Sequence, residues 1–244
     1  DVYKRQIRAQ SSDYQIFSAD YSQVELRVMA HLSQDEALIQ ALNNGEDIHT
    51  FTAKNIFNID KDEDVLPEMR RTAKIVNFGI MYGAGPFRLS QELDVPFGEA
   101  KKIKDAYFSK YKGIEDYIAK SKLLITSEKS VQTLLGRKRA VWDSDSQNKI
   151  RRDAAERMAI NMPIQGTAAE MIKIAMIKIY KDLKDNNLKS KLILQVHDEL
   201  LLEVHKDEVD YISEMVIKNM KKAIELDVPI EIDCGFGPSW YEAH

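Results

Sequence analysis

The apolar residues follow a helical period over most of the chain, and only a few short runs have the pattern of strands. Residues 14–19 (YQIFSA) predict one strand, and the arms LILQV and ELLLEV within 192–204 predict a hairpin. A last strand is expected at 228–236 (VPIEIDCGF), and a small hairpin at 131–141. Because the strands are few and dispersed, the pattern favours an α+β fold in which a small antiparallel sheet is backed by helices.

Terminal signals indicate where the helices begin. Ser33 and Glu36 form a capping-box pattern that starts one helix, and Asp47 can cap the next one. Pro67 stands where a further helix begins, and Pro163 separates two later helical patterns. The expected helices lie from about 24, at 33–44, 48–57 and 67–82, twice within 97–128, and at 148–161, 164–185 and 206–225.

The composition is that of an ordinary globular chain. Its 244 residues could form one large domain or two small ones, and 44% of them are apolar. No apolar run approaches the roughly 20 residues of a membrane helix, so no membrane partner is expected. The single cysteine, Cys234, fits a reducing cytoplasm and is expected to be a small core residue. The net charge of −4 argues against a general coat of DNA-binding charge, although a local basic patch would be enough.

The first six residues, DVYKRQ, stand apart from the rest of the sequence. They resemble the translation of a transposon end that is used to prepare DNA for sequencing. We therefore expect residues 1–6 to be an artefact and leave them out of the fold prediction. The alternative is an ordinary polar N-terminus.

The predicted hairpin carries charged residues in its middle. His197 and Asp198 fall between the two apolar arms, and charged residues rarely enter a buried core without a partner. At the tip of a hairpin they would be exposed while the arms are buried, either as a plain polar turn or as part of a site. Asp20 directly follows the strand at 14–19, where it could also be a helix cap. If the two strands are neighbours, Asp20 and Asp198 meet at one edge of the sheet.

Two such carboxylates would favour a divalent cation. They repel each other and raise each other's pKa, and a bound cation removes that cost. Mg²⁺ is the natural choice because it binds through one or two carboxylates together with substrate phosphates. Two ions roughly 3.5–4 Å apart form the arrangement used for in-line phosphoryl transfer. The sequence therefore indicates a site for two Mg²⁺ ions at Asp20 and Asp198.

A third group of residues indicates the substrate. Arg70, Lys74, Phe78 and Tyr82 recur every four residues, so they share one broad face of a helix. The cations suit a triphosphate, and the aromatic rings suit a base or a sugar. The alternative is a solvated basic turn followed by an aromatic stripe that belongs to the core.

Five segments together resemble family A DNA polymerases, the bacterial DNA polymerase I type. They are DYSQVELR (20–27), RRTAKIVNFGIMYG (70–83), ERMAINMPIQGTAAE (156–170), QVHDEL (195–200) and GFGPSWYEAH (235–244). The likeness runs from about residue 7 to residue 244, with all motifs in the family's order. It implies a right-hand architecture, with palm at 7–34 and 151–244, the catalytic hairpin at 192–204 in the palm, and mainly helical fingers at 35–150. The thumb and the first part of the palm, which precede this segment in the family, have no counterpart in the sequence.

The resemblance also implies metal ligands. Asp20 and Asp198 would be catalytic residues that bind two Mg²⁺ ions, helped by the backbone carbonyl of Tyr21. Glu199 neighbours the metals in the family. Adjacent strand residues face opposite ways, however, so Glu199 need not be a ligand.

Further roles follow from the same resemblance. Around the nucleotide, Arg70 and the catalytic Lys74 would hold the triphosphate with the help of His49. Phe78 would face the sugar, and Tyr82 would face the nascent base pair. Glu25 would block a ribose 2′-hydroxyl. Along the primer–template, the contacts would come from Arg157, Asn161 and Gln165, with His197 beside the primer terminus.

The implied activity is template-directed DNA synthesis in replication and repair, by a DNA-directed DNA polymerase that adds deoxynucleotides to a primer 3′-hydroxyl. The partners would be primer–template DNA and deoxynucleoside triphosphates, and the protein would be a monomer in the bacterial cytoplasm, associated with the nucleoid. Because the sequence has no counterpart of the family's thumb, we expect this chain alone to be inactive or only weakly active.

Basic residues provide further candidates for contacts to the DNA backbone, with a solvated surface as the alternative. They are Arg137, Lys138, Arg139, Lys149, Arg151 and Arg152. Two other classes of protein stay open on the residues alone. A different two-metal enzyme would use the carboxylates without the Arg70–Tyr82 face, and a non-catalytic nucleic-acid-binding module would use that face without the carboxylates.

Overall fold

The computed structural model describes residues 3–244 and divides them into two compact units. Unit 1 contains the described residues up to Val24 together with Ala168–Leu226 and Ile230–His244. Unit 2 contains Glu25–Thr167 and Asp227–Pro229. These limits differ from the palm and fingers limits expected at 34/35 and 150/151, which stay a prediction.

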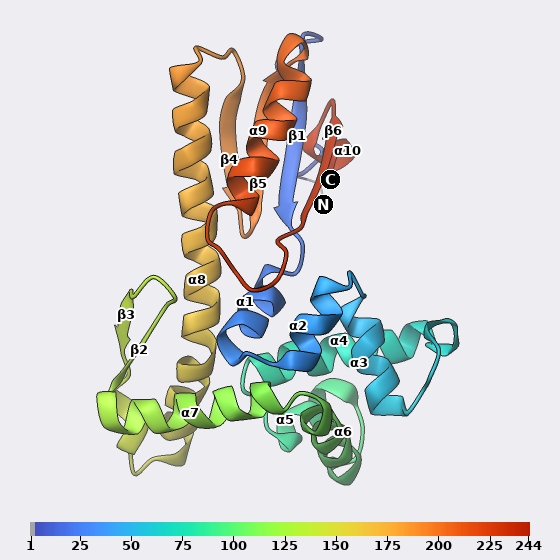
Figure 1. Ribbon diagram of the computed structural model, residues 1–244, viewed down its shortest axis with the longest axis vertical. Helices are drawn as coiled ribbons and strands as arrows, with labels where there is room; N and C mark the ends of the chain where they lie inside the picture. The colour runs from blue at the N-terminus through green and yellow to red at the C-terminus, as the bar shows by residue number, and fades with distance from the viewer. Residues whose placement is uncertain (1–2) are drawn as a thin grey trace. The chain divides into compact units, whose positions relative to one another are not determined.

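Unit 1 is built on a four-stranded antiparallel sheet (Figure 1). Its strands are β1 (Tyr14–Tyr21), β4 (Lys191–Val196), β5 (Glu199–His205) and β6 (Ile232–Gly237), in the order β4-β5-β1-β6. The two middle strands are the most buried of the four: every residue of β5 except Glu203 is buried, and so is the run from Ile16 to Ala19 in β1. The predicted α+β class and the antiparallel sheet are therefore confirmed.

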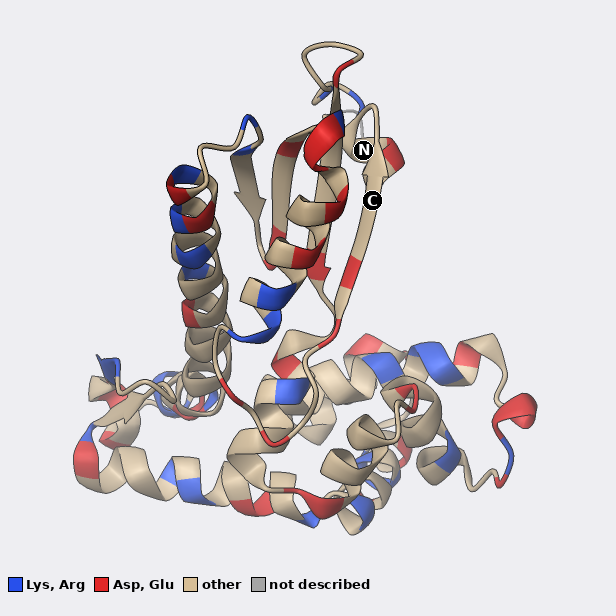
Figure 2. Cartoon of the chain, turned by 45° about the horizontal axis from the view of Figure 1, so that its top comes forward, with Lys and Arg blue, Asp and Glu red and all other residues tan. Residues whose placement is uncertain are grey.

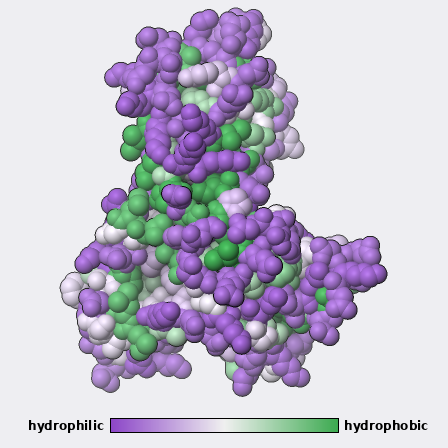
Figure 3. Space-filling view, viewed as in Figure 1, coloured by the Kyte–Doolittle hydropathy of each residue, from purple (hydrophilic) through white to green (hydrophobic). Residues whose placement is uncertain are grey.

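Helices cover the sheet of unit 1. After a 3₁₀ turn (Lys206–Glu208), α9 (Val209–Lys221) buries Ile212, Val216 and Met220, while its outward side is hydrophilic (Figure 3). The short α10 (Trp240–Ala243) packs against β6 so closely that a Cβ on Gly235 would lie 2.6 Å from the Ala243 carbonyl oxygen. Glycine is thus required where α10 crosses this strand.

Unit 2 is mainly helical. Between its helices, a small hairpin turns at Gly136, whose φ of +83° favours glycine. The elements that begin in unit 2 or at its border are α1 (Val24–Ser33), α2 (Glu36–Asn43), α3 (Ile48–Phe57), α4 (Pro67–Met81), α5 (Pro86–Leu93), α6 (Phe97–Lys110), α7 (Lys112–Glu128), β2 (Ser130–Gln132), β3 (Lys138–Ala140) and α8 (Lys149–Asp185), with 3₁₀ turns at Asp62–Asp64 and Trp142–Asp145.

Pro163 does not divide the chain into two helices, so this prediction was wrong. Helix α8 runs from Lys149 to Asp185 with Pro163 inside it. A proline at this position removes one N–H bond to the preceding turn. Ile160, three residues before the proline, and Ile164, directly after it, are fully buried, and their packing outweighs the loss of that bond.

Asp35, not Ser33, caps α2. The Asp35 Oδ1 atom accepts a hydrogen bond from the Leu38 amide at 3.0 Å. Its Oδ2 atom accepts one from the Gly113 amide at 2.8 Å, at the start of α7. One buried carboxylate thus serves two helix N-termini, a role that Ser33 with its single hydroxyl oxygen cannot fill.

Two other features differ from the sequence-based expectations, and one expectation is not tested. Helix α5 was not expected, and Cys234 is exposed rather than part of the core. Within the segment taken as an artefact, residues 1 and 2 lie outside the described residues, and the Tyr3 ring lies 5.9 Å from the ring of Trp240. The origin of this segment stays a prediction.

Among the residues that the structure describes, no helix is both long enough and apolar enough to cross a membrane.

Candidate functional site

In unit 1, Asp20 and Asp198 lie at the same edge of the sheet. Asp20 is near the end of β1 and pairs with Glu199, the first residue of β5, while Asp198 stands in the turn just before it. The Tyr21 amide donates a hydrogen bond of 3.3 Å to the Asp198 carbonyl oxygen, so the backbone holds this turn against the end of β1. The two strands are neighbours, as the metal hypothesis requires.

The Asp20 carboxylate is in an unfavourable environment. Burial raises its pKa to about 6, and the negative charges of Asp198 and Glu199 act in the same direction. Its Oδ1 atom is buried and has no hydrogen-bond partner among the described residues. A buried carboxylate oxygen without a donor is costly, and a cation placed there would remove the cost.

Glu199 is held more firmly. Its Oε1 atom accepts hydrogen bonds of 2.6 Å from both Ser18 Oγ and Trp240 Nε1. His244 Nδ1 lies 3.3 Å from the same oxygen. Glu199 thus lies beside Asp20, with one oxygen already satisfied by side chains from β1 and α10.

The donor set fits a hard cation that also takes ligands from a substrate. Within the described part of the chain, no group of three or more His, Cys, Asp or Glu side chains could hold a metal ion without such help. Mg²⁺ needs fewer, since it keeps water molecules and substrate phosphates in its shell and uses one or two carboxylates. Asp20, with its unpaired oxygen, and Asp198 meet this requirement.

Asp20→Asn should stabilise the metal-free protein at pH 7.5 by about 1–2 kcal/mol, allowing for solvent screening of a half-buried group. The folded-state pKa, about 6, lies above the ordinary value of 3.8, so the folded state binds the proton more tightly. The stabilising effect of this proton is fully present below pH 4 and is lost as the pH rises through 6.

The measurement is urea unfolding in EDTA at pH 4, 5, 6 and 7.5. The loss of stability with rising pH should be smaller in the variant than in the wild type. Mg²⁺ should stabilise the wild type at pH 7.5 more than the variant, and equal responses of both proteins would contradict the assignment.

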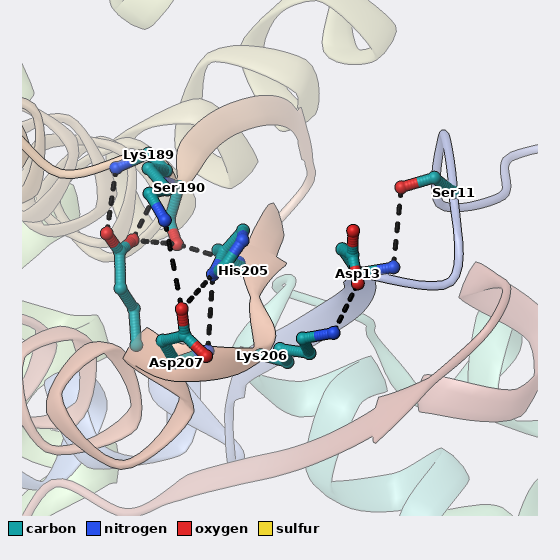
Figure 4. A network of polar contacts seen from close by, with 8 residues as sticks. Ser11, Asp13, Lys189, Ser190, His205, Lys206 and Asp207 are labelled. Atoms are coloured by element: carbon teal, nitrogen blue, oxygen red, sulfur yellow. Dashed lines mark hydrogen bonds and ion pairs between the residues drawn. The ribbon is translucent and has the colours of Figure 1, made fainter.

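The far end of the β4–β5 hairpin is closed by a polar network (Figure 4). The Glu208 carboxylate accepts hydrogen bonds of 2.9 Å from the amides of Lys189 and Ser190, and the Ser190 hydroxyl accepts one of 3.0 Å from the His205 amide. An ion pair between Lys206 and Asp13 joins the end of β5 to the start of β1. These contacts hold the strands in register at the end opposite Asp20 and Asp198.

In unit 2, helix α4 lines a hollow of about 620 Å³. Phe78 and Tyr82 lie on this hollow with their rings stacked at 6.2 Å, and the exposed Lys74 lies on it as well. The other lining residues are Arg71, Ile75, Gly79, Arg88 and Glu92. Three of the four residues predicted to share one helix face thus meet at one surface.

Arg70, the fourth residue, makes a separate contact. Its Nε and Nη2 atoms donate to the two carboxylate oxygens of Asp47 at 3.0 and 2.7 Å. Burial by itself would raise the pKa of Asp47. The hydrogen bonds from Arg70 and from the Thr50 amide outweigh this effect and lower the pKa to about 2. Sequence reasoning found Asp47 only as a helix cap, because nothing local links it to an arginine 23 residues away.

His49 and Glu25 also belong to unit 2. His49 is buried on α3, with its ring 5.9 Å from the ring of Phe78, and burial lowers its pKa to about 4. It is therefore neutral near pH 7 and would contact a phosphate through a hydrogen bond rather than as a cation. The Tyr82 hydroxyl donates a hydrogen bond to Glu25 Oε2, which connects the two residues assigned to the sugar and the base pair.

The residues assigned to the primer–template lie on α8 and on the hairpin tip. Arg157 lines a smaller hollow of about 220 Å³ beside Gly83 in unit 2, and Gln165 is exposed. Asn161 Oδ1 is buried, and the described residues provide no partner for it. His197, in unit 1, is exposed and has a φ of +53°, which places it at the tightest point of the turn.

Lys and Arg positions, blue in Figure 2, occur on the hairpin of unit 2 and on the start of α8. Of the six candidates for DNA backbone contacts, only Arg152 is half-buried, and the others are exposed. Their exposure is compatible with either DNA contact or a solvated surface.

Comparison with known proteins identifies the family. The sequence model that describes DNA polymerase family A matches residues 2–242 of this chain. The chain is 44% identical over 238 residues to DNA polymerase I of Caldicellulosiruptor bescii, covering 98% of this chain and 28% of that protein. It is 47% identical over 231 residues to DNA polymerase I of Bacillus subtilis, covering 95% and 26%. The chain thus spans about a quarter of the length of these relatives.

A solved structure is similar over nearly the whole chain. It is the polymerase domain of Pol1 from M. smegmatis in complex with DNA primer-template and dNTP, with a TM-score of 0.92 and 42% identity. The match covers 96% of this chain and 41% of the other chain. The fold is thus that of a polymerase palm with helical fingers. The chain belongs to DNA polymerase family A.

Proposed function

We propose that this chain carries the polymerase active site of a longer DNA polymerase, which adds deoxynucleotides to a primer 3′-hydroxyl under the direction of a template. The observation that carries the proposal is the carboxylate pair of unit 1, in which Asp20 keeps a buried, unpaired oxygen and a pKa of about 6 beside Asp198. The bound DNA primer-template and dNTP of the similar Pol1 structure support the choice of partners.

In this proposal, Asp20, Asp198 and the Tyr21 carbonyl hold two Mg²⁺ ions. When bound, these ions supply activation of the primer hydroxyl and stabilisation of the leaving pyrophosphate. The chain's own cations assist, because Lys74 and Arg70 neutralise charge that develops on the triphosphate. Phe78 and Tyr82 test the shape of the nucleotide and the new base pair, while base pairing itself selects the base.

Membership in the family favours this function over the two alternatives left open by the sequence. A nuclease or phosphatase would need the carboxylates only, and a binding module would need the cations and rings only. We expect a monomer that acts in the bacterial cytoplasm with the nucleoid, in replication and repair, and these remain predictions.

The test is primer extension by a chimera that joins this chain to the thumb and early palm of a related polymerase. The chimera should add only the nucleotide that pairs with the template, and only when Mg²⁺ is present. Addition without regard to the template, or addition in EDTA, would contradict the proposal.

Sugar selection gives a finer test of the unit 2 residues. In the chimera, Glu25→Ala should raise ribonucleotide incorporation by about 10-fold or more, because it removes the side chain that fills the space beside C2′. Tyr82→Phe removes the hydroxyl that holds Glu25 and should change the ratio in the same direction by a smaller factor. Competition between ATP and dATP in single-turnover extension measures the ratio. The exposed Glu99→Ala serves as control, and a ratio unchanged in Glu25→Ala would show that Glu25 has another role.

Phe78→Tyr should raise acceptance of dideoxynucleotides by about 10-fold or more, because the added hydroxyl can form a hydrogen bond that replaces the one lost with the 3′-hydroxyl. Chain termination at a fixed ratio of ddNTP to dNTP measures the effect. Phe87→Tyr adds the same hydroxyl to a ring that is 66% exposed and should change nothing. Equal termination by both variants would mean that Phe78 does not face the sugar.

A further inference from the structure

A buried chain of hydrogen bonds crosses unit 2 and has no part in the mechanism above. The Tyr111 hydroxyl lies 2.8 Å from Thr52 Oγ1, and Thr52 Oγ1 donates to Asn77 Oδ1 at 3.1 Å. Asn77 Nδ2 in turn lies 3.0 Å from His49 Nδ1. All four residues are at most 3% exposed. This series of hydrogen bonds links the end of α6 to α3 and α4. It ends on His49, the histidine assigned to the nucleotide.

The donors and acceptors along this series of hydrogen bonds are ordered in one direction. An asparagine amide accepts at Oδ1 and donates only at Nδ2. Because Thr52 takes the Oδ1 atom, the group that faces His49 is a donor. The ring nitrogen opposite a donor must carry a lone pair, so His49 Nδ1 is unprotonated and the proton of the neutral ring is on Nε2.

The charges around His49 suit an anion. The cations Arg70 and Lys74 of α4 act on the ring electrostatically and lower its pKa, and only Asp47, at the start of its own helix, acts in the opposite direction. Burial suppresses the doubly protonated form more strongly than any of these charges. A neutral ring with a proton on Nε2 is still a good donor to a phosphate oxygen.

We propose that Asn77, held in place by Thr52 and Tyr111, is a positioning residue that keeps His49 in the Nε2–H tautomer, so that Nε2–H can donate to a phosphate oxygen of the nucleotide. The identity of the anion rests on the proposed function. The tautomer does not, since it follows from the buried contacts alone.

The first test needs no ligand. Nitrogen-15 NMR of the 244-residue chain distinguishes protonated from unprotonated ring nitrogens, and a His49→Gln spectrum assigns the signals. We expect a protonated Nε2 and an unprotonated Nδ1. A wild-type His49 with its proton on Nδ1 would overturn the proposal without any further variant.

Two variants test the cause. Asn77→Asp replaces the donor by a carboxylate of the same shape, so the proton should move to Nδ1 and the titration midpoint of His49 should rise by about 1–3 pH units. Thr52→Val removes the hydroxyl that orients the amide and should give a mixture of both tautomers. Asn55→Asp is the matched control, the same isosteric change on the helix that carries His49, at a residue that donates to the Phe51 carbonyl. An unchanged tautomer in Asn77→Asp would overturn the positioning role.

The second test uses inorganic triphosphate as the probe. Its addition should shift the Nε2–H signal of His49, and Asn77→Asp should weaken its binding by about 10-fold or more, as expected for a lost hydrogen bond to a charged group. Binding that shifts Lys74 signals but leaves His49 unchanged would overturn the donor role. Complete absence of binding would overturn the nucleotide-binding function and the donor role together, while the tautomer measured without ligand would stand.

Discussion

Asp198→Asn should lower nucleotide addition by the chimera by about 10³-fold or more while leaving the fold intact. The amide keeps the shape of the side chain at the hairpin tip but removes the charge that would hold Mg²⁺. Asp20→Asn should have an effect of the same order, because Asp20 is the other carboxylate of the pair and keeps a buried oxygen without a partner among the described residues.

Single-turnover extension of a labelled primer at saturating Mg²⁺ measures this loss, and circular dichroism checks the fold. Asp233→Asn is a demanding control, because Asp233 pairs with Asp20 across β1 and β6 and its charge acts on the same carboxylate, yet its side chain is exposed. We expect it to lose less than about 10-fold. Extension that survives Asp198→Asn, or that is lost equally in Asp233→Asn, would contradict the assignment of the metal ligands.

The second large effect concerns the chain by itself. We expect residues 1–244 to extend a primer at least about 10³-fold more slowly than the chimera at moderate salt, since losing six or so phosphate contacts weakens DNA binding by that order. The chain spans about a quarter of the length of the DNA polymerases I of C. bescii and B. subtilis, and its net charge of −4 opposes DNA binding. In the proposed function the reacting groups belong to this chain, but a primer end that is not held reacts slowly.

Extension by the two proteins should be compared at equal concentrations and at two salt concentrations. The chimera with Asp198→Asn controls for activity brought in by the added segment. If the chain alone extends a primer as fast as the chimera, in a template-dependent manner, then it already contains all the contacts that the reaction needs.

The sequence by itself determined the strands, most helices and the position of the carboxylates. An apolar run interrupted by two polar residues favours a hairpin with its tip exposed, and the structure places Asp198 beside the end of β1 because β5 pairs with that strand. Asp47 and Pro67 begin their helices as predicted, because these signals act within one turn of the residue that carries them. Local rules suffice for features whose causes are local.

Tertiary structure alone decided the features whose partners are distant in sequence. Asp35 replaced Ser33 as a cap because it also binds the start of α7, and α8 continues through Pro163 because both sides of the proline are buried. Arg70 pairs with Asp47 across 23 residues, and Asn77 orients His49 across 28. The spacing of four in the sequence placed Arg70 on the right helix but could not indicate its partner. Contacts of this kind depend on which helices pack together, and no periodicity within one helix contains that information.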